Sequence, residues 1–266
     1  MKLPAIENLD RLPPFSPVLN RLLATIASEE ASLTEVSALI ENDTMLAGSV
    51  LKLVNSPLYS FQGTVNSVQH AVTILGVNKL RNVALSMSVA SMWSDVDTPE
   101  GWSVERFNQH AVATALLSDI LARRLARRYR EGAFVAGLLH DVGKVLIAIT
   151  YPRDFAGILG AREREWLHVT HADLSGLVLE RWNLPDVIER AAACHHTPDR
   201  AGPRVHLSHI VYAANRLANA CGYSVLERSE KPGAREAAFE ALGLRKLASR
   251  ILDEFQVDFE LLKAFL

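Results

Sequence analysis

The feature that most constrains this chain is a run of apolar residues, 133–149, which is interrupted near its middle by polar side chains. The run reads AFVAGLLHDVGKVLIAI, and its polar residues are His140, Asp141 and Lys144. It is too short, and too polar at its centre, to span a bilayer, so we expect a buried helix. Helical spacing places Lys144 on the same sector as His140 and Asp141. The core must therefore accommodate an imidazole, a carboxylate and an ammonium group.

Polar groups buried in such a run are costly unless each has a partner. A divalent metal ion is one such partner, because it binds a neutral imidazole and a carboxylate and compensates for their lost hydration. A hydrogen-bonded core histidine beside a paired carboxylate is the simpler interpretation of His140 and Asp141 taken alone. Gly137 and Gly143 weaken a helix, but they allow another backbone or a ligand to approach closely. The other histidines decide between these interpretations.

Composition narrows the class of protein. The 266 residues suffice for one large domain or two small ones, and 49% are hydrophobic, enough for a sizeable core. The net charge of −2 gives no indication of nucleic acid or an acidic membrane surface as a partner. Cys194 and Cys221 form no disulfide framework, which fits a reducing compartment. Without an apolar segment at its start or a stretch of transmembrane length, the chain is expected to be cytoplasmic.

The apolar residues recur with helical period along nearly the whole chain, and strand signals are almost absent. We therefore predict an all-α, multi-helix bundle. The acidic, turn-rich stretch SDVDTPEGW, 94–102, is the best candidate boundary. We expect an N-terminal helical lobe over 1–95, a lobe carrying the chemistry over 103–222, and a C-terminal helical tail over 223–266. The lobes should pack through apolar faces, so limited proteolysis near Asp97 should not release two soluble halves.

Four further histidines lie on apolar faces of other predicted helices. His110 follows the apolar stripe of a helix over 104–128. Thr170 and Asp173 resemble a capping box, which places His171 in the first turn of another helix. The pair His195-His196 ends a third helix, and a fourth helix carries an asparagine on a face of small residues, Asn215. We expect these groups to converge on His140 and Asp141 in one core.

Two other polar features have simpler interpretations. The arginines in ARRLARRYRE, 122–131, form a solvated face where cations suit a helix C-terminus, with binding of a phosphate or a partner as the alternative. His70 is interpreted as a surface or capping histidine.

Imidazoles and a carboxylate that converge in one core are suited to one or two transition-metal ions, namely Fe, Mn, Zn, Co or Ni. Asp141 would be the bridging carboxylate. A dinuclear site of this kind activates water and clamps a phosphoryl group, and Lys144 would stabilise charge on that phosphate. On this hypothesis the catalytic residues are Asp141 and Lys144.

The order of these residues and the segment LLHDVGK resemble the HD superfamily of metal-dependent phosphohydrolases. The segment THADLSGLVLERWNLPDVIERAAACHH is similar to the HDOD and HD-GYP branches. ENDTMLAGSVLKLVNSPLYS and VNSVQHAVTILGVNKLRNVAL resemble the HDOD domain, so the resemblance covers roughly residues 10 to 220. It implies a bundle of α-helices, and many HDOD proteins act in bacterial signal transduction.

The resemblance also implies roles for individual residues. Lys144 falls on the active-site lysine of the HD-GYP type, and the metal-ligand positions are His110, His140, Asp141, His171, His195 and His196. Asn215, in IVYAANRLA, falls where a ligand Asp is expected. Asn is a neutral and weaker ligand, so the ion bound by His110, His140 and Asp141 should be held less well. The stretch TPDRAGPRV, after His196, lacks the GYP element linked to cyclic di-GMP hydrolysis.

Two functions of different classes follow. In the first, the chain is a signalling protein that binds a protein partner, a nucleotide or a cyclic dinucleotide without turnover. In the second, it is a working metal-dependent phosphodiesterase or phosphohydrolase acting on a nucleotide or cyclic dinucleotide. We favour the first, because Asn215 replaces a ligand Asp and the GYP element is missing; a metal-binding but inactive protein lies between them. A purely structural helical repeat is disfavoured, since the sequence has no internal repeat.

Overall fold

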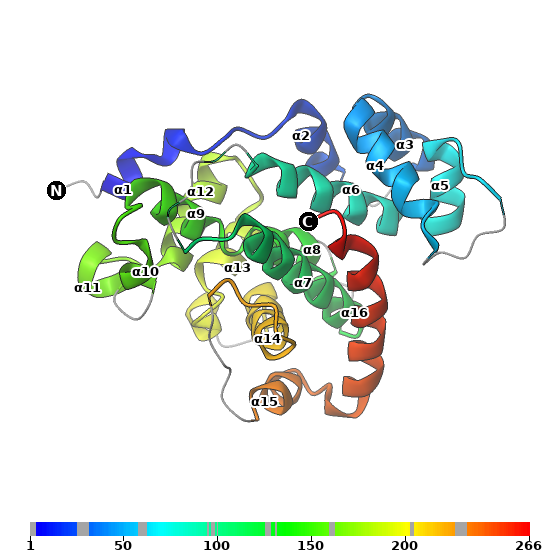
Figure 1. Cartoon of the computed structure of the whole chain (residues 1–266). Helices are drawn as coiled ribbons and strands as arrows, with labels where there is room; N and C mark the ends of the chain where they lie inside the picture. Colours follow the sequence, from blue (N-terminus) through cyan, green and yellow to red (C-terminus); the bar gives the residue numbers. More distant parts are fainter. Residues whose placement is uncertain are drawn as a thin grey trace. The chain divides into compact units, whose positions relative to one another are not determined.

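The structure, a computed structural model, describes residues 4–25, 32–57, 63–94, 96, 99, 101–125, 129–130, 132–159, 163–202, 205–226 and 233–266. Within these ranges the regular structure is entirely helical, which confirms the predicted all-α class (Figure 1). The chain forms two compact units. The larger comprises Met1–Pro14 and Asp95–Gln256, and the smaller comprises Phe15–Ser94 and Val257–Leu266.

The smaller unit is a set of short amphipathic helices whose starts follow local capping rules. Side-chain oxygens of Ser16, Ser32, Asp43 and Ser67 each accept a backbone N–H of the following turn. The last residues of the chain belong to this unit, where Lys79 Nζ lies 2.6 Å from Asp258 Oδ1. Its helices are α2 (Pro17–Ala24), α3 (Leu33–Glu41), α4 (Thr44–Val54), α5 (Val68–Leu75) and α6 (Val77–Met92).

The larger unit holds the remaining helices and the residues of chemical interest. It begins with α1 (Pro4–Glu7) and η1 (Leu9–Arg11), and α16 (Ala248–Lys263) contributes to both units. Between them lie α7 (Val104–Arg123), α8 (Ala133–Leu139), α9 (Val142–Thr150), α10 (Phe155–Gly157), α11 (Glu163–Leu167), α12 (His171–Arg181), α13 (Asp186–Ala193), η5 (Pro198–Ala201), α14 (Leu207–Ala220), α15 (Ala234–Ala241) and η6 (Arg245–Leu247).

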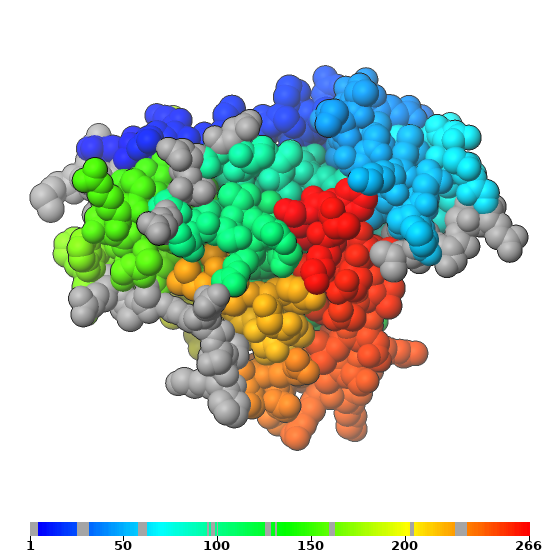
Figure 2. Space-filling view, in the orientation of Figure 1, coloured from blue at the N-terminus to red at the C-terminus, as the bar shows by residue number. Residues whose placement is uncertain are grey.

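Helix α7 is central to the larger unit, because it packs against both α8 and α14. Helix α12 packs against α9 and α13, so α7, α8, α9, α12, α13 and α14 form one connected bundle. Helices α14 and α15 also pack together, and Figure 2 shows them side by side at the surface in amber and orange. This bundle carries every predicted site residue.

The central apolar run differs from the single helix predicted for it. It forms two helices, α8 and α9, which meet at His140 and Asp141. The periodicity continues across the junction, but the amide of Gly143 donates to Ser175 Oγ at 2.9 Å, outside the helix. The stretch Ala133–Thr150 is long and apolar enough to cross a membrane, yet 83% of it is buried inside the protein. That burial is consistent with the core of a soluble protein.

Some predicted boundaries also shift. Helix α7 ends at Arg123 rather than at residue 128, and residues 126–128, which include Arg127 and Arg128, lie outside the described residues. The helical tail expected at the C-terminus contains α15 and α16. The predicted division into a lobe over 1–95, a lobe over 103–222 and a tail over 223–266 stays a prediction. The two compact units are each assembled from two segments that are not contiguous in the sequence.

Candidate metal centre

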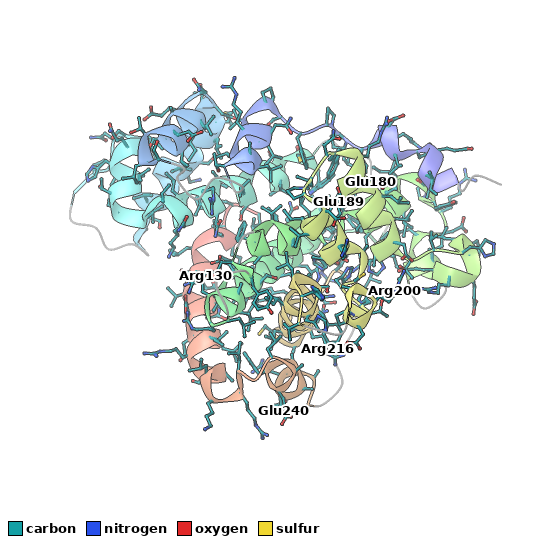
Figure 3. All side chains as sticks on the ribbon, turned by 180° about the vertical axis from the view of Figure 1, so that it is seen from behind. Arg130, Glu180, Glu189, Arg200, Arg216 and Glu240 are labelled. Carbon is teal, nitrogen blue, oxygen red and sulfur yellow. The ribbon has the colours of Figure 1, made fainter. Side chains whose placement is uncertain are left out.

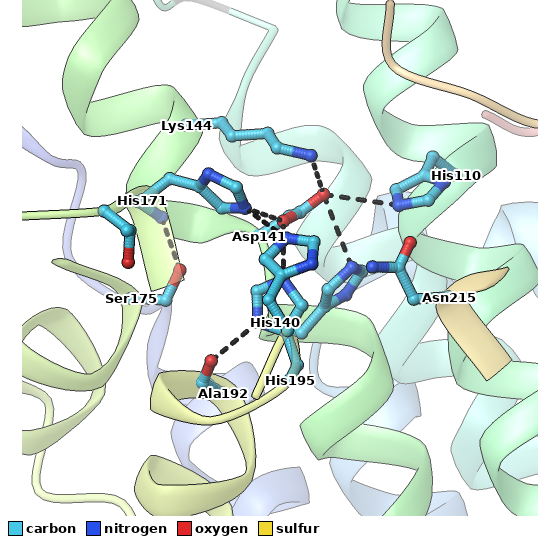
Figure 4. A network of polar contacts seen from close by, with 12 residues as sticks. His110, His140, Asp141, Lys144, His171, Ser175, Ala192, His195 and Asn215 are labelled. Atoms are coloured by element: carbon cyan, nitrogen blue, oxygen red, sulfur yellow. Dashed lines mark hydrogen bonds and ion pairs between the residues drawn. The ribbon is translucent and has the colours of Figure 1, made fainter. Parts of the chain in front are cut away.

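The carboxylate of Asp141 lies at the centre of the cluster, with imidazoles on both sides (Figure 4). Its Oδ2 atom is 3.2 Å from His110 Nε2 and 3.3 Å from His140 Nε2. Its Oδ1 atom is 3.3 Å from His171 Nε2 and 3.5 Å from His195 Nε2. The two oxygens therefore face two different pairs of histidines, as a bridging carboxylate would.

The ligand positions come from several parts of the bundle. His110 lies on α7, and Asn215 lies on α14. His140 and Asp141 occupy the junction of α8 and α9, where their side chains leave the backbone next to each other. Helix α12 begins at His171, after a capping box formed by Thr170 and Asp173 as predicted, and the pair His195-His196 follows α13. The sequence-predicted residues are thus brought together in the larger unit.

In three of the histidines the ring nitrogen that faces away from Asp141, Nδ1, already forms a hydrogen bond. Nδ1 of His110 donates to the carbonyl of Tyr223 at 2.7 Å, and Nδ1 of His140 donates to the carbonyl of Gly137 at 2.8 Å. Nδ1 of His195 donates to the carbonyl of Ala192 at 2.6 Å. A carbonyl can only accept, so these bonds fix the proton on Nδ1. In a neutral ring Nε2 then presents a lone pair to Asp141.

The charge states agree with this arrangement. Burial lowers the pKa of His140 to about 3, and it also lowers the pKa of His195 and His196. Burial alone would raise the pKa of Asp141, but the neighbouring His140 and the Lys144 ammonium outweigh it and hold that pKa well below its ordinary value. At neutral pH the cluster therefore combines an ionised carboxylate, Asp141, with the neutral imidazoles of His140, His195 and His196.

A metal ion fits the donor set that results. Nε2 of His110, His140 and His195, together with Oδ1 of Asp141, are buried and have no hydrogen-bond partner. Four buried acceptors facing one another are unfavourable without a cation between them. Nitrogen and oxygen donors of this kind are the usual ligands of transition metals. The described residues include two groups spaced to hold an ion, His110–His140–Asp141 and His171–His195–His196.

The His171 half, meaning His171, His195 and His196 on the Oδ1 side of Asp141, contains a residue that the sequence did not reveal. Both carboxylate oxygens of Glu163 contact His171 Nδ1, at 2.6 and 2.8 Å, and Oε2 also accepts the His171 backbone N–H at 2.9 Å. Burial and Lys144 lower the pKa of His171, but Asp141 and Glu163 outweigh them and raise it. A carboxylate behind a ligand histidine orients the ring and increases its basicity. His196, the exposed member, places its Nε2 2.9 Å from His171 Nε2.

The His110 half, meaning His110 and His140 on the Oδ2 side of Asp141, is bounded by Lys144 and Asn215. Lys144 Nζ donates to Asp141 Oδ2 at 2.5 Å, and its side chain is only 14% exposed. The Asn215 side chain points toward the histidines with its amide nitrogen (Figure 4). Its oxygen accepts from Asn219 Nδ2 at 2.9 Å. This half therefore already contains a cation, Lys144. It also has the neutral amide of Asn215 at the position where the resemblance implies a ligand carboxylate.

Close contact between α9 and α12 sets the distance between the helices that carry these groups. A Cβ atom on Gly143 would lie 2.1 Å from the backbone carbonyl oxygen of His171. On the other side of the core, a Cβ atom on Gly137 would lie 2.8 Å from the backbone carbonyl oxygen of Thr114. The sequence-based expectation that these glycines allow another backbone to approach agrees with both contacts.

The remaining polar features lie away from Asp141. Arg123 and Arg124 both form ion pairs with Glu254, so this part of the arginine run is engaged within the protein. Arg200, labelled in Figure 3, places Nη1 3.2 Å from Asp173 Oδ1, on the capping carboxylate of α12. His70 lies in α5 of the smaller unit.

Comparison with known proteins identifies relatives of the chain and structures that share its fold. The chain is 24% identical to an uncharacterized protein of Treponema pallidum (strain Nichols) over 205 residues, 71% of this chain and 38% of that one. It spans about a third of the length of the curated relatives it matches.

Two solved structures share the fold over 97% of this chain. One is an HDOD domain protein of unknown function from Geobacter sulfurreducens, with a TM-score of 0.77, 20% identity and 97% of that chain covered. The other is a proposed phosphohydrolase from Shewanella amazonensis SB2B, with a TM-score of 0.74, 23% identity and 98% of that chain covered. A family model, the HDOD domain, matches residues 12–198. Since this match covers more than half of its length, the chain belongs to the HDOD domain family.

Proposed function

We propose that this chain is a cytoplasmic signalling protein that holds one divalent metal ion tightly and has weak or no hydrolytic activity. The ion would be held by His171, His195 and His196 together with Asp141, and Fe, Mn, Zn, Co and Ni all suit that set. The observation that carries the proposal is the Lys144 ammonium on Asp141 Oδ2, 2.5 Å away. A second ion would need that same oxygen.

The two halves differ in the charge they offer. The His171 half has the free Oδ1 of Asp141 and the buried carboxylate of Glu163 behind the ring, and both favour a dication. In the His110 half, Lys144 already neutralises Oδ2, and Asn215 presents an amide nitrogen instead of a carboxylate. Since one elementary charge separates Asn from Asp, we propose that this half binds an ion weakly.

The residues themselves would perform three tasks. Asp141 and the histidines would fix the ion, and Glu163 would keep His171 in the orientation that presents Nε2. The Lys144 ammonium would offset negative charge on a phosphate-bearing ligand next to Asp141. A bound ion supplies Lewis acidity and, where water reaches it, lowers the pKa of that water. Without a second ion, the clamp on both oxygens of a phosphodiester is incomplete, which accounts for weak turnover.

Family membership supports the signalling part of the proposal, since many HDOD proteins act in bacterial signal transduction. A protein partner, a nucleotide or a cyclic dinucleotide would be the molecule that carries the signal. The free cysteines Cys194 and Cys221 support a reducing cytoplasm. The alternative is an active phosphodiesterase or phosphohydrolase, and the arrangement that favours it is the nearly complete set of ligands with an exposed His196 at one side.

The substitution Asn215→Asp separates the two functions. Restoring the carboxylate should raise the metal content from about one ion per chain toward two, a count that rests on the ligand inventory. Phosphodiester hydrolysis should rise with it. Elemental analysis of the purified protein and a hydrolysis screen with nucleotides and cyclic dinucleotides are the measurements.

Asn183→Asp is the matched control, because it makes the same change on an exposed turn between α12 and α13. It should leave the metal content and the hydrolysis unchanged. If the unmutated protein carries two ions and cleaves a phosphodiester rapidly, the enzyme alternative replaces the proposal.

A further inference from the structure

Asp141 occupies the N-cap position of α9, yet its carboxylate does not cap that helix. An N-cap aspartate ordinarily accepts the backbone N–H of the second or third helical residue, which in α9 are Gly143 and Lys144. Among the described residues that begin α9, the Asp141 side chain accepts no such bond, and its two oxygens face histidines instead. Other groups must therefore satisfy the first amides of α9.

Asp43, at the start of α4, shows the ordinary arrangement in the same chain. Its backbone is extended, with φ −119° and ψ 103°, and its Oδ1 accepts the backbone N–H of Leu46 at 3.0 Å. The backbone of Asp141 has φ −105° and ψ 10° instead. The two aspartates hold the same position at the start of a helix, but only Asp43 uses its carboxylate to cap that helix.

Two groups other than the Asp141 carboxylate accept the first amides of α9. The N–H of Gly143 donates to Ser175 Oγ on α12 at 2.9 Å. The N–H of Lys144 donates to the backbone carbonyl of Asp141 at 2.8 Å. Because Ser175 is fully buried, its hydroxyl takes the place that water holds at an exposed helix end. A side chain from a neighbouring helix thus acts as the cap of α9.

The close packing of α9 on α12 brings the Ser175 hydroxyl within reach of this amide. Ser175 lies one turn after His171, so both side chains leave the same face of α12 (Figure 4). A Cβ atom on Gly143 would lie 2.8 Å from the backbone nitrogen of Ser175, so a side chain at this position would push the two helices apart. Helix α12 therefore supplies both a predicted metal ligand and the group that caps the helix beginning after Asp141.

We propose that Ser175 is a positioning residue of the metal centre: its hydroxyl caps α9 in place of Asp141 and so leaves the Asp141 carboxylate free to bind an ion. Without that hydroxyl, the buried N–H of Gly143 would be unpaired, and the carboxylate two residues earlier would be the acceptor suited to cap it. The effect on ion binding rests on the proposed function, whereas the release of the carboxylate is a property of the metal-free protein.

Crystal structures of the metal-free unmutated protein and of metal-free Ser175→Ala test the release directly. In the variant, Asp141 should adopt the extended backbone that Asp43 has and place a carboxylate oxygen about 3 Å from the nitrogen of Gly143. Its Oδ1 atom should correspondingly leave His171, which it approaches to 3.3 Å in the unmutated protein. An Asp141 carboxylate that stays between the histidines in Ser175→Ala would overturn the proposal.

Competition with a chromophoric chelator measures the consequence for the ion. Ser175→Ala should weaken binding of the tight ion by about tenfold, because the ion must first withdraw the carboxylate from a helix cap of ordinary strength. Ser118→Ala is the matched control, since Ser118 is a fully buried serine of α7 whose hydroxyl has no hydrogen-bond partner in the described part of the chain. It should leave the affinity unchanged, and equal losses in the two variants would contradict a specific role for Ser175.

Ser175→Thr separates the hydroxyl from the packing around it. The added methyl group enters a fully buried position, so the urea midpoint of unfolding should fall. The hydroxyl remains, so the affinity for the ion should stay within about threefold of that of the unmutated protein. A loss as large as that in Ser175→Ala would mean that packing of α12, and not capping, supports the centre.

The failure of this proposal can be distinguished from a failure of the proposed function. If the unmutated protein binds two ions, or none tightly, the proposed function is wrong. The metal-free crystal structures still decide in that case whether Ser175 keeps the Asp141 carboxylate from capping α9.

Discussion

The two halves of the metal centre share one carboxylate but are supported in different ways. On the Oδ2 side of Asp141, the Nδ1–H groups of His110 and His140 donate hydrogen bonds to backbone carbonyls. The charged group bonded to Oδ2 itself is the ammonium of Lys144. Around Oδ1, His171 is backed by the carboxylate of Glu163, and no ammonium is bonded to that oxygen among the described residues. The Oδ1 half therefore has an excess of negative charge and lone pairs, whereas the Oδ2 half is already balanced.

This difference shows why the identity of the ligands alone does not decide how many ions bind. Both halves contain two buried imidazoles at similar distances from Asp141, 3.2 and 3.3 Å on one side and 3.3 and 3.5 Å on the other. What separates them is the charge of the groups just behind the ligands. In a buried site such charges are poorly screened, so one carboxylate or one ammonium can determine whether a dication is held.

The largest expected effect comes from removing one histidine from each half. His195→Ala should weaken binding of the tight ion by more than about a hundredfold, because it removes a ligand and not only an outer partner. His110→Ala should change that affinity by no more than about threefold. The two rings are equally buried, at 0% and 1% exposure, so the cavities they leave are comparable.

Competition with a chromophoric chelator measures this affinity, and circular dichroism verifies that both variants are folded. Equal losses in the two variants would mean that the two halves act as one site, and the distinction drawn here would be wrong.

Gly143→Ala should damage the His171 half through the backbone. The new methyl group would meet the carbonyl oxygen of His171 at 2.1 Å, so α9 and α12 must separate. Overpacking of this kind costs typically about 1–3 kcal/mol in the free energy of unfolding, and a rigid backbone neighbour places it at the upper end. Urea unfolding measures the change.

Gly48→Ala provides the contrast, because nothing lies within 4 Å of its added carbon. It lies on an exposed face of α4, where Ala should stabilise the helix by about 1 kcal/mol relative to Gly. Opposite signs for the two substitutions are expected. A neutral Gly143→Ala variant with unchanged metal affinity would show that the close α9–α12 contact does not support the centre.

Glu163→Gln should act on one half only. Loss of the carboxylate behind His171 should lower the affinity for the tight ion by about ten- to a hundredfold, as is typical for outer partners of metal ligands. Glu165→Gln, two residues away on α11, is the matched control and should leave the affinity unchanged. If Glu163→Gln instead left the affinity intact, the charge behind the ring could not be what distinguishes the two halves.

The helical class could be predicted from the sequence, and so could the convergence of the histidines and Asp141 in one core, because both depend on local sequence patterns. Caps such as Ser32 and Asp43 and the capping box at Thr170 follow from short-range rules, and the structure has each of them. The histidines could be assigned to one core because each lay on an apolar face.

The groups behind the ligands could not be predicted in the same way. A backbone carbonyl such as that of Tyr223 has no signature in the sequence, and Glu163 reaches His171 only because α11 folds back toward α12. The break between α8 and α9 was missed because apolar periodicity continues through it, while the bond from Gly143 to Ser175 is tertiary. The charge balance of each half therefore became visible only in three dimensions.

The smallest expected effect concerns Lys144, and it tests the balanced half directly. If the ammonium neutralises Oδ2 of Asp141, then Lys144→Gln should strengthen binding of a second ion by the His110 half, by about tenfold or less, since the amide keeps a hydrogen-bond donor there. Affinity at the His171 half should rise less, because Oδ1 faces the opposite pair of histidines. Stepwise metal titration separates the two events. A fall in affinity at the His110 half would mean that Lys144 organises the Asp141 carboxylate for metal instead of competing with it, and the contrast between the two halves would then rest on Asn215 and Glu163 alone.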